Sequence, residues 1–303
     1  MQKTRAPRRQ VDGILLLDKP LGLSSNAALQ IARRIYQAEK AGHTGALDPL
    51  ATGLLPLCFG QATKLSAYLL DADKRYRAVV RLGTATSTGD AEGEVVATSD
   101  PARISREQLE AAIPGLCGSI RQVPPMYSAL KREGQPLYRM ARAGIEVERE
   151  PREIVIHELR LLAFEAGQFE FEVRCSKGTY VRTLAEDWAA AVGQRAHLAG
   201  LRRTGLGGFD AGSMVSLERL QALDLAAADA LLLPPAAALA NWPEVEVDAA
   251  GAARLAHGQP LESADGPEGR VAVYGPGHVL LGIAVRDAAG RLAPKRWMRE
   301  SRA

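Results

Sequence analysis

The chain has 303 residues, of which 47% are hydrophobic and 24% charged, and this composition is typical of a globular protein rather than a disordered or collagen-like one. Its length predicts about two domains. The three cysteines form no C-x-x-C pair, which indicates reduced thiols, and no apolar run reaches about 18 residues, which excludes a membrane-spanning helix. The net charge of +3 is too small to identify a partner. We therefore expect a reduced, cytoplasmic protein without a secretory signal, a membrane segment or a built-in zinc site.

The charge is unevenly distributed along the chain. Residues 1–210 have a net charge of +5 (29 Lys and Arg against 24 Asp and Glu), residues 211–250 have −5, and residues 251–303 have +3. A basic body, an acidic connector and a basic tail suit a polyanionic partner that is contacted at two places. Ordinary scatter of surface charge explains the same numbers.

The first part of the chain predicts alternating strands and helices. Strands are expected at 13–17, 54–59 and 76–82, and helices from Ser24 or Ser25 to about 37, at 63–70 and after Ser105. The strands are short apolar runs bounded by turn residues. The helices follow serines that can cap them, and Ser105 with Gln108 has the spacing of a capping box.

Residues 123–152 interrupt this pattern. Prolines and glycines punctuate the segment, and basic side chains alternate with Tyr127 and Tyr138, so we expect an excursion from the core. Regular elements then resume, with strands at 153–164, 169–175 and 197–204 and a helix at 179–192. Apolar and charged residues alternate strictly at 169–175, which is the period of a half-buried strand.

An Ala- and Pro-rich connector at 222–242 is expected to form short helices. It divides the chain into residues 1–242 and a small terminal unit at 243–303. In that unit, a helix at 251–257 and strands at 270–274, 279–286 and 291–294 suit a small β-barrel.

Glycines and short side chains are concentrated at residues 42–53, with the sequence Gly-His-Thr-Gly-Ala-Leu-Asp-Pro-Leu-Ala-Thr-Gly. Its glycines imply a tight loop, but it matches no phosphate-binding pattern. Asp48 precedes Pro49, so its backbone is extended and its carboxylate is presented from a stiff loop. Asp48 is then either a functional carboxylate or a residue that stabilises the turn.

A second stretch spans 175–184, where a buried strand ends, Gly178 turns the chain and a helix begins. Arg182 falls in the first turn of that helix, where it can hold a carboxylate in bidentate geometry. The alternative is a surface arginine, although a cation near a helix N-terminus is slightly unfavourable.

Together these stretches resemble the bacterial tRNA pseudouridine-55 synthase family over essentially the whole chain. The resemblance is carried by residues 13–20, 42–53, 73–76, 124–131 and 175–184. It implies an α/β (α+β) pseudouridine synthase fold with a long mixed, mainly antiparallel sheet and a central cleft. It also implies an RNA-clamping insertion at 123–152 within a catalytic domain at 1–242, and a small, mostly-β RNA-binding domain at 243–303.

The resemblance implies that uridine 55 in the T loop of tRNA becomes pseudouridine. The C1′–N1 bond breaks, the uracil rotates and C5 is joined to C1′. Asp48 matches the family's catalytic aspartate; attack at C1′, attack at C6 and elimination all stay open. Such chemistry needs no cofactor and no metal.

The same resemblance assigns supporting roles in the site. Arg182 would pair with Asp48, and Tyr76 would stack on the target base and help to remove the C5 proton. Tyr180 and Leu201 would shape the pocket. His43 would fill the stack that the flipped base leaves, although a histidine bonded to a nearby carbonyl is the plainer alternative.

The resemblance also implies that basic residues contact phosphates of the T stem-loop; the alternative for each one alone is a solvated surface charge. They are Lys19, Lys64, Lys131, Arg132, Lys177, Arg202 and Arg203. We expect a cytoplasmic monomer that needs no protein partner. The RNA-guided archaeal and eukaryotic relatives share the aspartate loop but lack the long insertion, which favours the stand-alone bacterial type. A tRNA-folding chaperone is the competing function.

Overall fold

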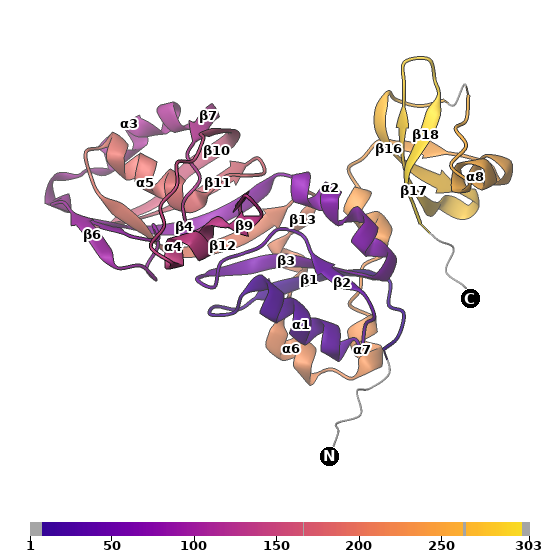
Figure 1. Ribbon diagram of the computed structural model, residues 1–303, viewed down its shortest axis with the longest axis horizontal. Coiled ribbons are helices and arrows are strands. Elements are labelled where there is room, and N and C mark those ends of the chain that lie inside the picture. Colours follow the sequence, from indigo (N-terminus) through magenta and orange to yellow (C-terminus); the bar gives the residue numbers. More distant parts are fainter. Residues whose placement is uncertain (1–7, 166, 263–264, 299–303) are drawn as a thin grey trace.

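The structure is a computed structural model that describes residues 8–165, 167–262 and 265–298. Figure 1 shows a long curved sheet with helices against it and a smaller sheet beside it. The large sheet has ten strands, in the order β14-β1-β3-β12-β4-β11-β10-β7, with β2 on β3 and β13 on β12. Their bounds are β1 Gly13–Lys19, β2 Ala41–His43, β3 Ala51–Phe59, β4 Lys74–Leu82, β7 Gly118–Gln122, β10 Arg152–Glu165, β11 Gln168–Cys175, β12 Ala196–Leu206, β13 Phe209–Asp210 and β14 Val215–Ser216.

The pairing of these strands confirms a mixed, mainly antiparallel sheet. Only β1 with β14 and β3 with β12 run parallel, and the remaining neighbours are antiparallel. A hairpin of β5 (Thr84–Thr86) and β6 (Val95–Thr98) lies beside the sheet, and the segment between these two strands reaches β12 through a bridge from Asp90 to Leu198.

The helices begin where local capping allows. α1 (Ser25–Ile35) starts after Ser24, whose side chain accepts the N–H of Ala27. α3 (Arg106–Leu116) starts at a complete capping box of Ser105 and Gln108, as the spacing predicted. α5 is Val181–Ala191, two residues later than the predicted start, because Gly178 turns with φ +84° and Tyr180 is still extended. The other helical segments are η1 Gly60–Leu65, α2 Ser66–Asp71, η2 Pro101–Arg103, η3 Ala211–Ser213, α6 Leu217–Ala222, α7 Leu225–Asp229, η4 Pro235–Leu239, α8 Ala249–Ala256 and η5 Pro276–His278.

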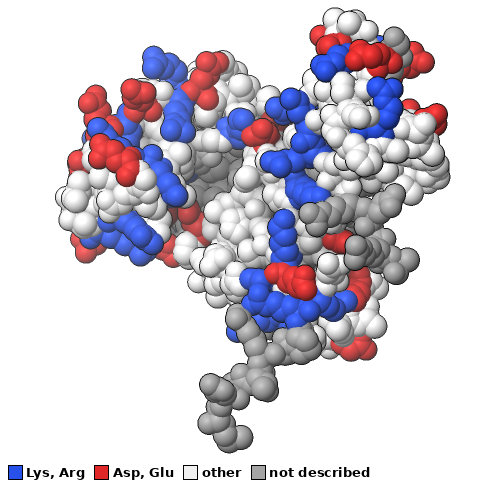
Figure 2. All heavy atoms as spheres, turned by 45° about the vertical axis from the view of Figure 1, so that its right-hand side comes forward, with Lys and Arg blue, Asp and Glu red and all other residues white. Residues whose placement is uncertain are grey.

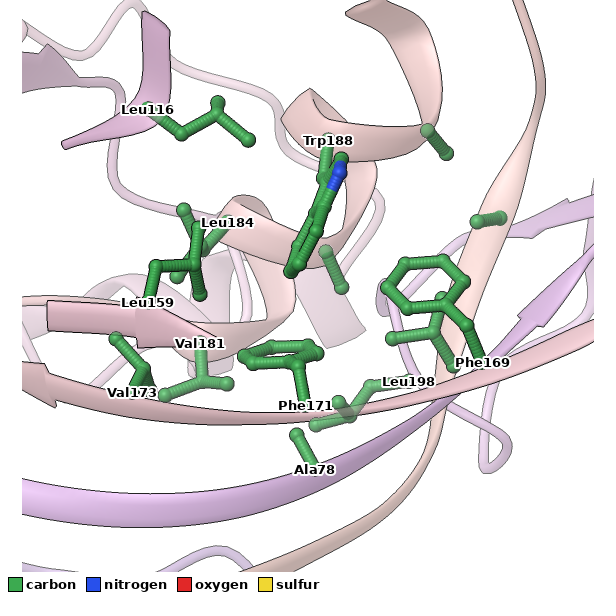
Figure 3. Packing of buried hydrophobic residues seen from close by; sticks show 14 of the residues in the cluster. Ala78, Leu116, Leu159, Phe169, Phe171, Val173, Val181, Leu184, Trp188 and Leu198 are labelled. Carbon is green, nitrogen blue, oxygen red and sulfur yellow. The ribbon is translucent and has the colours of Figure 1, made fainter. Parts of the chain in front are cut away.

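One core lies between α3, α5 and one half of the sheet. Figure 3 shows Trp188 of α5 standing over Phe169 and Phe171 of β11, with Ala78 of β4 beyond them. The Trp188 indole donates to the carbonyl of Leu109 at 3.0 Å, so its polar edge is satisfied. The apolar members of 169–175 are all buried, which confirms the predicted alternation.

A second core lies between α1, α6 and the other half of the sheet, around Leu15, Leu57 and Phe59. Tyr76 and Leu201 are only partly buried and pack against both clusters. They therefore lie where the two helix-covered halves of the sheet meet.

The insertion at 123–152 leaves the sheet after β7 and returns in β10. It contains a short hairpin, β8 (Lys131–Arg132) and β9 (Gln135–Pro136), followed by α4 (Leu137–Arg142). Few of its side chains are buried; Ser128 and Leu137 are among those that are. This is the excursion from the core that the sequence predicted.

The terminal unit is built on a separate four-stranded sheet in the linear order β15-β16-β17-β18. Its strands are β15 Glu244–Glu246, β16 Gly269–Gly275, β17 Val279–Arg286 and β18 Leu292–Trp297. No pairing among the described strands joins β15 to β18, so these strands form an open sheet where the sequence predicted a small β-barrel. Within the described ranges, no helix is long and apolar enough to cross a membrane.

The terminal unit rests on the segment 60–71 of the body. Leu65, Tyr274 and Ile283 are buried in one cluster that both parts share. Lys64 Nζ donates to the carbonyl of Trp297 at 2.7 Å, and the Arg270 guanidinium lies 5.7 Å from the centre of the Tyr68 ring.

Candidate active site

Asp48 lies in the loop between β2 and β3, and its neighbours hold that loop in place. The Ser25 hydroxyl accepts the Leu47 N–H at 2.7 Å and donates to the Leu47 carbonyl at 3.0 Å. Arg203 Nη2 donates to the Gly45 carbonyl at 3.1 Å, and the Asp48 carbonyl accepts the N–H of Ala51 at 3.0 Å. The Asp48 side chain is 50% exposed. A fixed backbone thus presents a carboxylate that a substrate can reach.

Arg182 is the partner of that carboxylate. Its Nη2 lies 2.9 Å from Asp48 Oδ2, and its Nη1 lies 3.6 Å from Oδ2 of Asp90. Nη1 also donates to the carbonyl of Thr88 and Nη2 to that of Tyr127, both at 2.8 Å. The side chain of Arg182 is only 8% exposed, so the guanidinium is largely shielded from water. Four acceptors fix its position.

Asp90 is a member of the site that the sequence analysis missed. It is 3% exposed, and its Oδ1 accepts the Thr88 hydroxyl at 2.6 Å and the Glu92 N–H at 3.1 Å. These bonds fold the 86–93 loop around the carboxylate, while Oδ2 faces Arg182. The available signal was an aspartate among threonines and glycines in a loop. That pattern also describes an ordinary exposed turn, so it did not reveal a buried ion pair.

Tyr76 and Leu201 come from adjacent strands. On β12, Leu201 pairs with Ala78 of β4 and with Ala51 of β3, the residue that closes the Asp48 turn. Tyr76 is opposite Arg203 in the same ladder. Burial raises the pKa of Tyr76 above its usual value, so its phenol is protonated at neutral pH. Leu201 and Tyr76 therefore lie on the neighbouring strands β12 and β4, and Asp48 lies in the loop that leads into β3, next to β12. All three are at the junction between the two helix-covered halves of the large sheet.

Tyr180 occupies the N-cap position of α5, and burial raises the pKa of its phenol as well. Its backbone is held by Gln122, which the sequence analysis also missed. His43 lies in β2 opposite Leu57. Its Nδ1 is buried and has no hydrogen-bond partner among the described residues. Burial lowers the pKa of His43, and the positive charge of Arg203 acts in the same direction, so the imidazole is neutral.

The prediction that Lys19 and Arg203 contact phosphates is wrong. Lys19 is fully buried, and its Nζ donates to the carbonyls of Pro20 at 2.9 Å and Leu23 at 2.6 Å. Burial lowers the pKa of Lys19 to about 8, against the opposing effect of the nearby Asp48 charge. Arg203 is 1% exposed, and its Nε donates to the Leu54 carbonyl at 2.6 Å. Both cations hold the loops around Asp48 instead.

The other five predicted RNA contacts lie on the surface or near it. Lys131 and Arg132 are exposed in the insertion. Lys177 pairs with Asp71 at 2.8 Å, Arg202 with Asp18 at 2.8 Å, and Lys64 contacts Trp297 as described above. Figure 2 shows Lys and Arg side chains gathered between the body and the terminal unit, with acidic residues scattered among them. Contact with RNA stays a prediction for these five.

Three family models match successive parts of the chain. The family described as "TruB family pseudouridylate synthase (N terminal domain)" matches residues 33–181. "tRNA pseudouridylate synthase B C-terminal domain" matches residues 182–240, and "Pseudouridine synthase II TruB, C-terminal" matches residues 243–298.

Curated relatives match over nearly the whole length. The chain is 54% identical over 292 residues to the tRNA pseudouridine synthase B of Azoarcus sp. (strain BH72), covering 96% of each chain. It is 52% identical over 304 residues to that of Stutzerimonas stutzeri (strain A1501), covering 99% of each.

Among solved structures, the chain is similar to one in "Structure of H/ACA RNP bound to a substrate RNA containing 2'-deoxyuridine". The TM-score is 0.73 at 21% identity, with 95% of this chain and 85% of the other covered. This likeness concerns the fold alone and confirms the pseudouridine synthase fold. By its relatives and matching domains, the chain belongs to the TruB family of tRNA pseudouridine synthases, which are isomerases.

Proposed function

We propose that the protein converts uridine 55 in the T loop of tRNA into pseudouridine, with Asp48 as its catalytic carboxylate. The observation that carries this proposal is the pairing of a half-exposed Asp48 with a nearly buried Arg182 that is itself held at three further points. A carboxylate fixed in this way is available to substrate while its geometry is set beforehand. Names of the relatives support the choice of tRNA as substrate.

The target base is stacked inside the folded RNA loop, so it must be flipped into the pocket at a cost of a few kcal/mol. Arg182 holds Oδ2 of Asp48, and we assign the other carboxylate oxygen to the reacting nucleotide. The C1′–N1 bond then breaks, the uracil rotates and C5 bonds to C1′. Attack of Asp48 at C1′, its attack at C6 and an elimination remain the alternatives for the first step.

The remaining pocket residues are assigned by their place around Asp48. Tyr76 stacks on the flipped uracil and helps to remove the C5 proton: its hydroxyl oxygen accepts that proton while the phenol proton passes to water. Leu201 and Tyr180 form walls of the pocket, and the neutral His43 supports the RNA stack that has lost its base.

Two parts of the molecule bind the rest of the RNA arm in this proposal. The catalytic domain is residues 1–242, with its insertion at 123–152 as a clamp, and residues 243–303 form an RNA-binding domain. The separate sheet of the terminal unit supports this division. We further propose a cytoplasmic monomer that needs no protein partner. Assistance to tRNA folding is a second role that fits the same RNA contacts.

The assignment of Asp48 is tested with Asp48→Asn. A neutral amide keeps the shape but cannot act as the anionic group, so turnover should vanish while RNA affinity stays within about tenfold. Transcript tRNA is incubated with each protein and analysed by mass spectrometry. Because pseudouridine has the same mass as uridine, the pseudouridine is first given a chemical tag. Retention of a few per cent of the wild-type single-turnover rate, with deamidation excluded, would contradict the assignment. A tRNA-folding activity that survives in this variant would establish the second role.

The clamp is tested by the salt dependence of RNA binding. Four basic side chains of the insertion are replaced together by Ala: Lys131, Arg132, Arg139 and Arg142. Each lost phosphate contact should flatten the plot of log affinity against log salt by roughly 0.7 to 0.9. A control variant replaces Arg77, Arg81 and Arg160, which are exposed on the strands of the sheet. Equal slopes for wild type and the insertion variant would give the insertion a structural role.

A further inference from the structure

We propose that Gln122 is a positioning residue that fixes the start of α5, and with it Tyr180 and Arg182, to the root of the insertion, by which we mean residues 122–127, where the chain leaves β7. This inference rests on the proposed function, because Gln122 would act by keeping Arg182 aligned with Asp48, the proposed catalytic carboxylate. Gln122 bonds to the backbone of Tyr180 and not to its pocket-forming side chain or to Asp48, so it acts on the site through other residues.

Gln122 occupies the point where the insertion joins the sheet. It is the last residue of β7 and pairs with Arg152, the first residue of β10. The chain therefore leaves the sheet at Gln122 and returns at its direct neighbour. Its side chain is buried, with 2% of the residue exposed, although β7 is an edge strand of the large sheet.

The carboxamide of Gln122 binds both backbone groups of Tyr180. Its Oε1 accepts the Tyr180 N–H at 2.8 Å, and its Nε2 donates to the Tyr180 carbonyl at 3.1 Å. That carbonyl also accepts the first helical bond of α5, from the N–H of Leu184 at 3.0 Å. No side chain of the N-cap residue itself caps this helix. Gln122 thus supplies a cap from another element, and it needs a group that donates and accepts at once.

The same root makes a second contact with the site. Tyr127, at the start of the insertion, accepts a hydrogen bond from Arg182 Nη2, the nitrogen that also faces Asp48. Arg182 is the second residue of the helix that Gln122 caps. A displacement of the insertion root consequently shifts both the backbone from which Arg182 projects and one of the acceptors of its guanidinium. Closure of the insertion on RNA is in this way coupled to the alignment of Asp48.

Two variants separate the donor and acceptor roles of Gln122. Gln122→Met keeps the length of the side chain, leaves the Tyr180 N–H without its partner and leaves the Tyr180 carbonyl with only the helical bond from Leu184. Gln122→Glu accepts but cannot donate while ionised, whereas its protonated form restores both bonds. Burial raises the pKa of a carboxyl at such a position. Gln221→Met and Gln221→Glu are the matched controls, because Gln221 is exposed on α6.

The experiment measures single-turnover pseudouridine formation at saturating tRNA, RNA affinity and thermal melting between pH 6 and 8. Loss of a buried hydrogen-bonded pair predicts a rate about 10- to 100-fold lower for Gln122→Met, with RNA affinity within about threefold. Gln122→Glu should also lose rate at pH 8, where its carboxylate faces the Tyr180 carbonyl without a donor, and should recover toward the wild-type rate as the pH falls. The Gln221 variants should follow wild type throughout.

A rate within twofold of wild type for Gln122→Met would overturn the inference. A loss in Gln122→Glu that stays constant from pH 6 to 8, relative to wild type, would do the same and leave Gln122 a purely structural residue. If Gln122→Met does not fold, the pH series of Gln122→Glu still decides. Failure of the wild-type protein to form pseudouridine would refute the proposed function instead.

Discussion

The ion pair of Arg182 and Asp90 should be coupled energetically, and three variants measure the coupling. Arg182→Met removes the guanidinium but keeps much of its apolar stem. Asp90 then stays buried with its charge, bonded only by Thr88 and Glu92 in the described structure. Asp90→Asn removes the buried charge instead, and the double variant removes both.

The magnitudes follow from burial. Arg182→Met leaves the buried Asp90 without its countercharge, which costs about 3–5 kcal/mol. That is a large part of the roughly 5–15 kcal/mol by which a typical domain is stable. Asp90→Asn costs less, because Arg182 keeps Asp48 and two carbonyls as partners. The double variant has no unpaired buried charge, so it should be less destabilised than the sum of the single variants. We expect a coupling of about 1–3 kcal/mol.

Urea unfolding of the four proteins gives the free energies, and single-turnover pseudouridine formation gives the rates. The double variant should regain stability relative to Arg182→Met but no activity, because Asp48 still lacks its partner. Additive free energies, within about 0.5 kcal/mol, would refute the inferred interaction between Arg182 and Asp90. Recovered turnover in the double variant would show that Arg182 does not act through Asp48.

Three further changes test the site and the sheet. Tyr76→Phe keeps the stacking ring and should slow the single-turnover reaction without weakening RNA binding; an unchanged rate would exclude the hydroxyl from the chemistry. Burial raises the pKa of Glu186 to about 7, so the native state binds this proton more tightly than the unfolded chain and stability is lost as pH rises from about 4.5 to 7. Glu186→Gln should therefore stabilise by about 1–3 kcal/mol in urea at pH 8 and hardly at pH 4.5, and equal effects would contradict this reasoning. Gly53 has φ +96°, and a Cβ at this position would lie 2.3 Å from the Arg203 carbonyl oxygen. Gly53→Ala should therefore lower the free energy of unfolding by roughly 3 kcal/mol. It should also lower the melting temperature far more than the control Gly134→Ala, where the added Cβ meets no atom within 4 Å.

Local signals predicted the local structure well. The cap at Ser24 or Ser25, the capping box at Ser105 and the alternation at 169–175 depend on residues a few positions apart. All three were confirmed, with Ser24 as the first cap. The glycine-rich loop at 42–53 likewise identified the segment that presents Asp48. Such features could be predicted because the physics that produces them acts within one element.

Features that join distant segments were not predicted. Asp90 and Gln122 become site residues only because the fold places the loop of Asp90 and the end of β7 against α5, and nothing near them in the sequence shows this. The resemblance led us to expect Lys19 and Arg203 at phosphates, which would require exposed side chains. Their positions in β1 and β12 instead direct them inward, where backbone carbonyls around the Asp48 loop bind them. Burial of a cation depends on acceptors supplied from elsewhere in the fold.

The cluster that the terminal unit shares with the body limits how this protein can be shortened. Leu65 and Leu239 belong to the body and connector, yet their burial depends on Tyr274 and Ile283 of the terminal sheet. An enzyme cut at residue 242 would expose these leucines and Tyr68 as one apolar surface, which favours self-association. A soluble minimal version of the catalytic body would therefore need polar replacements at this patch before its RNA affinity could be compared with that of the full chain.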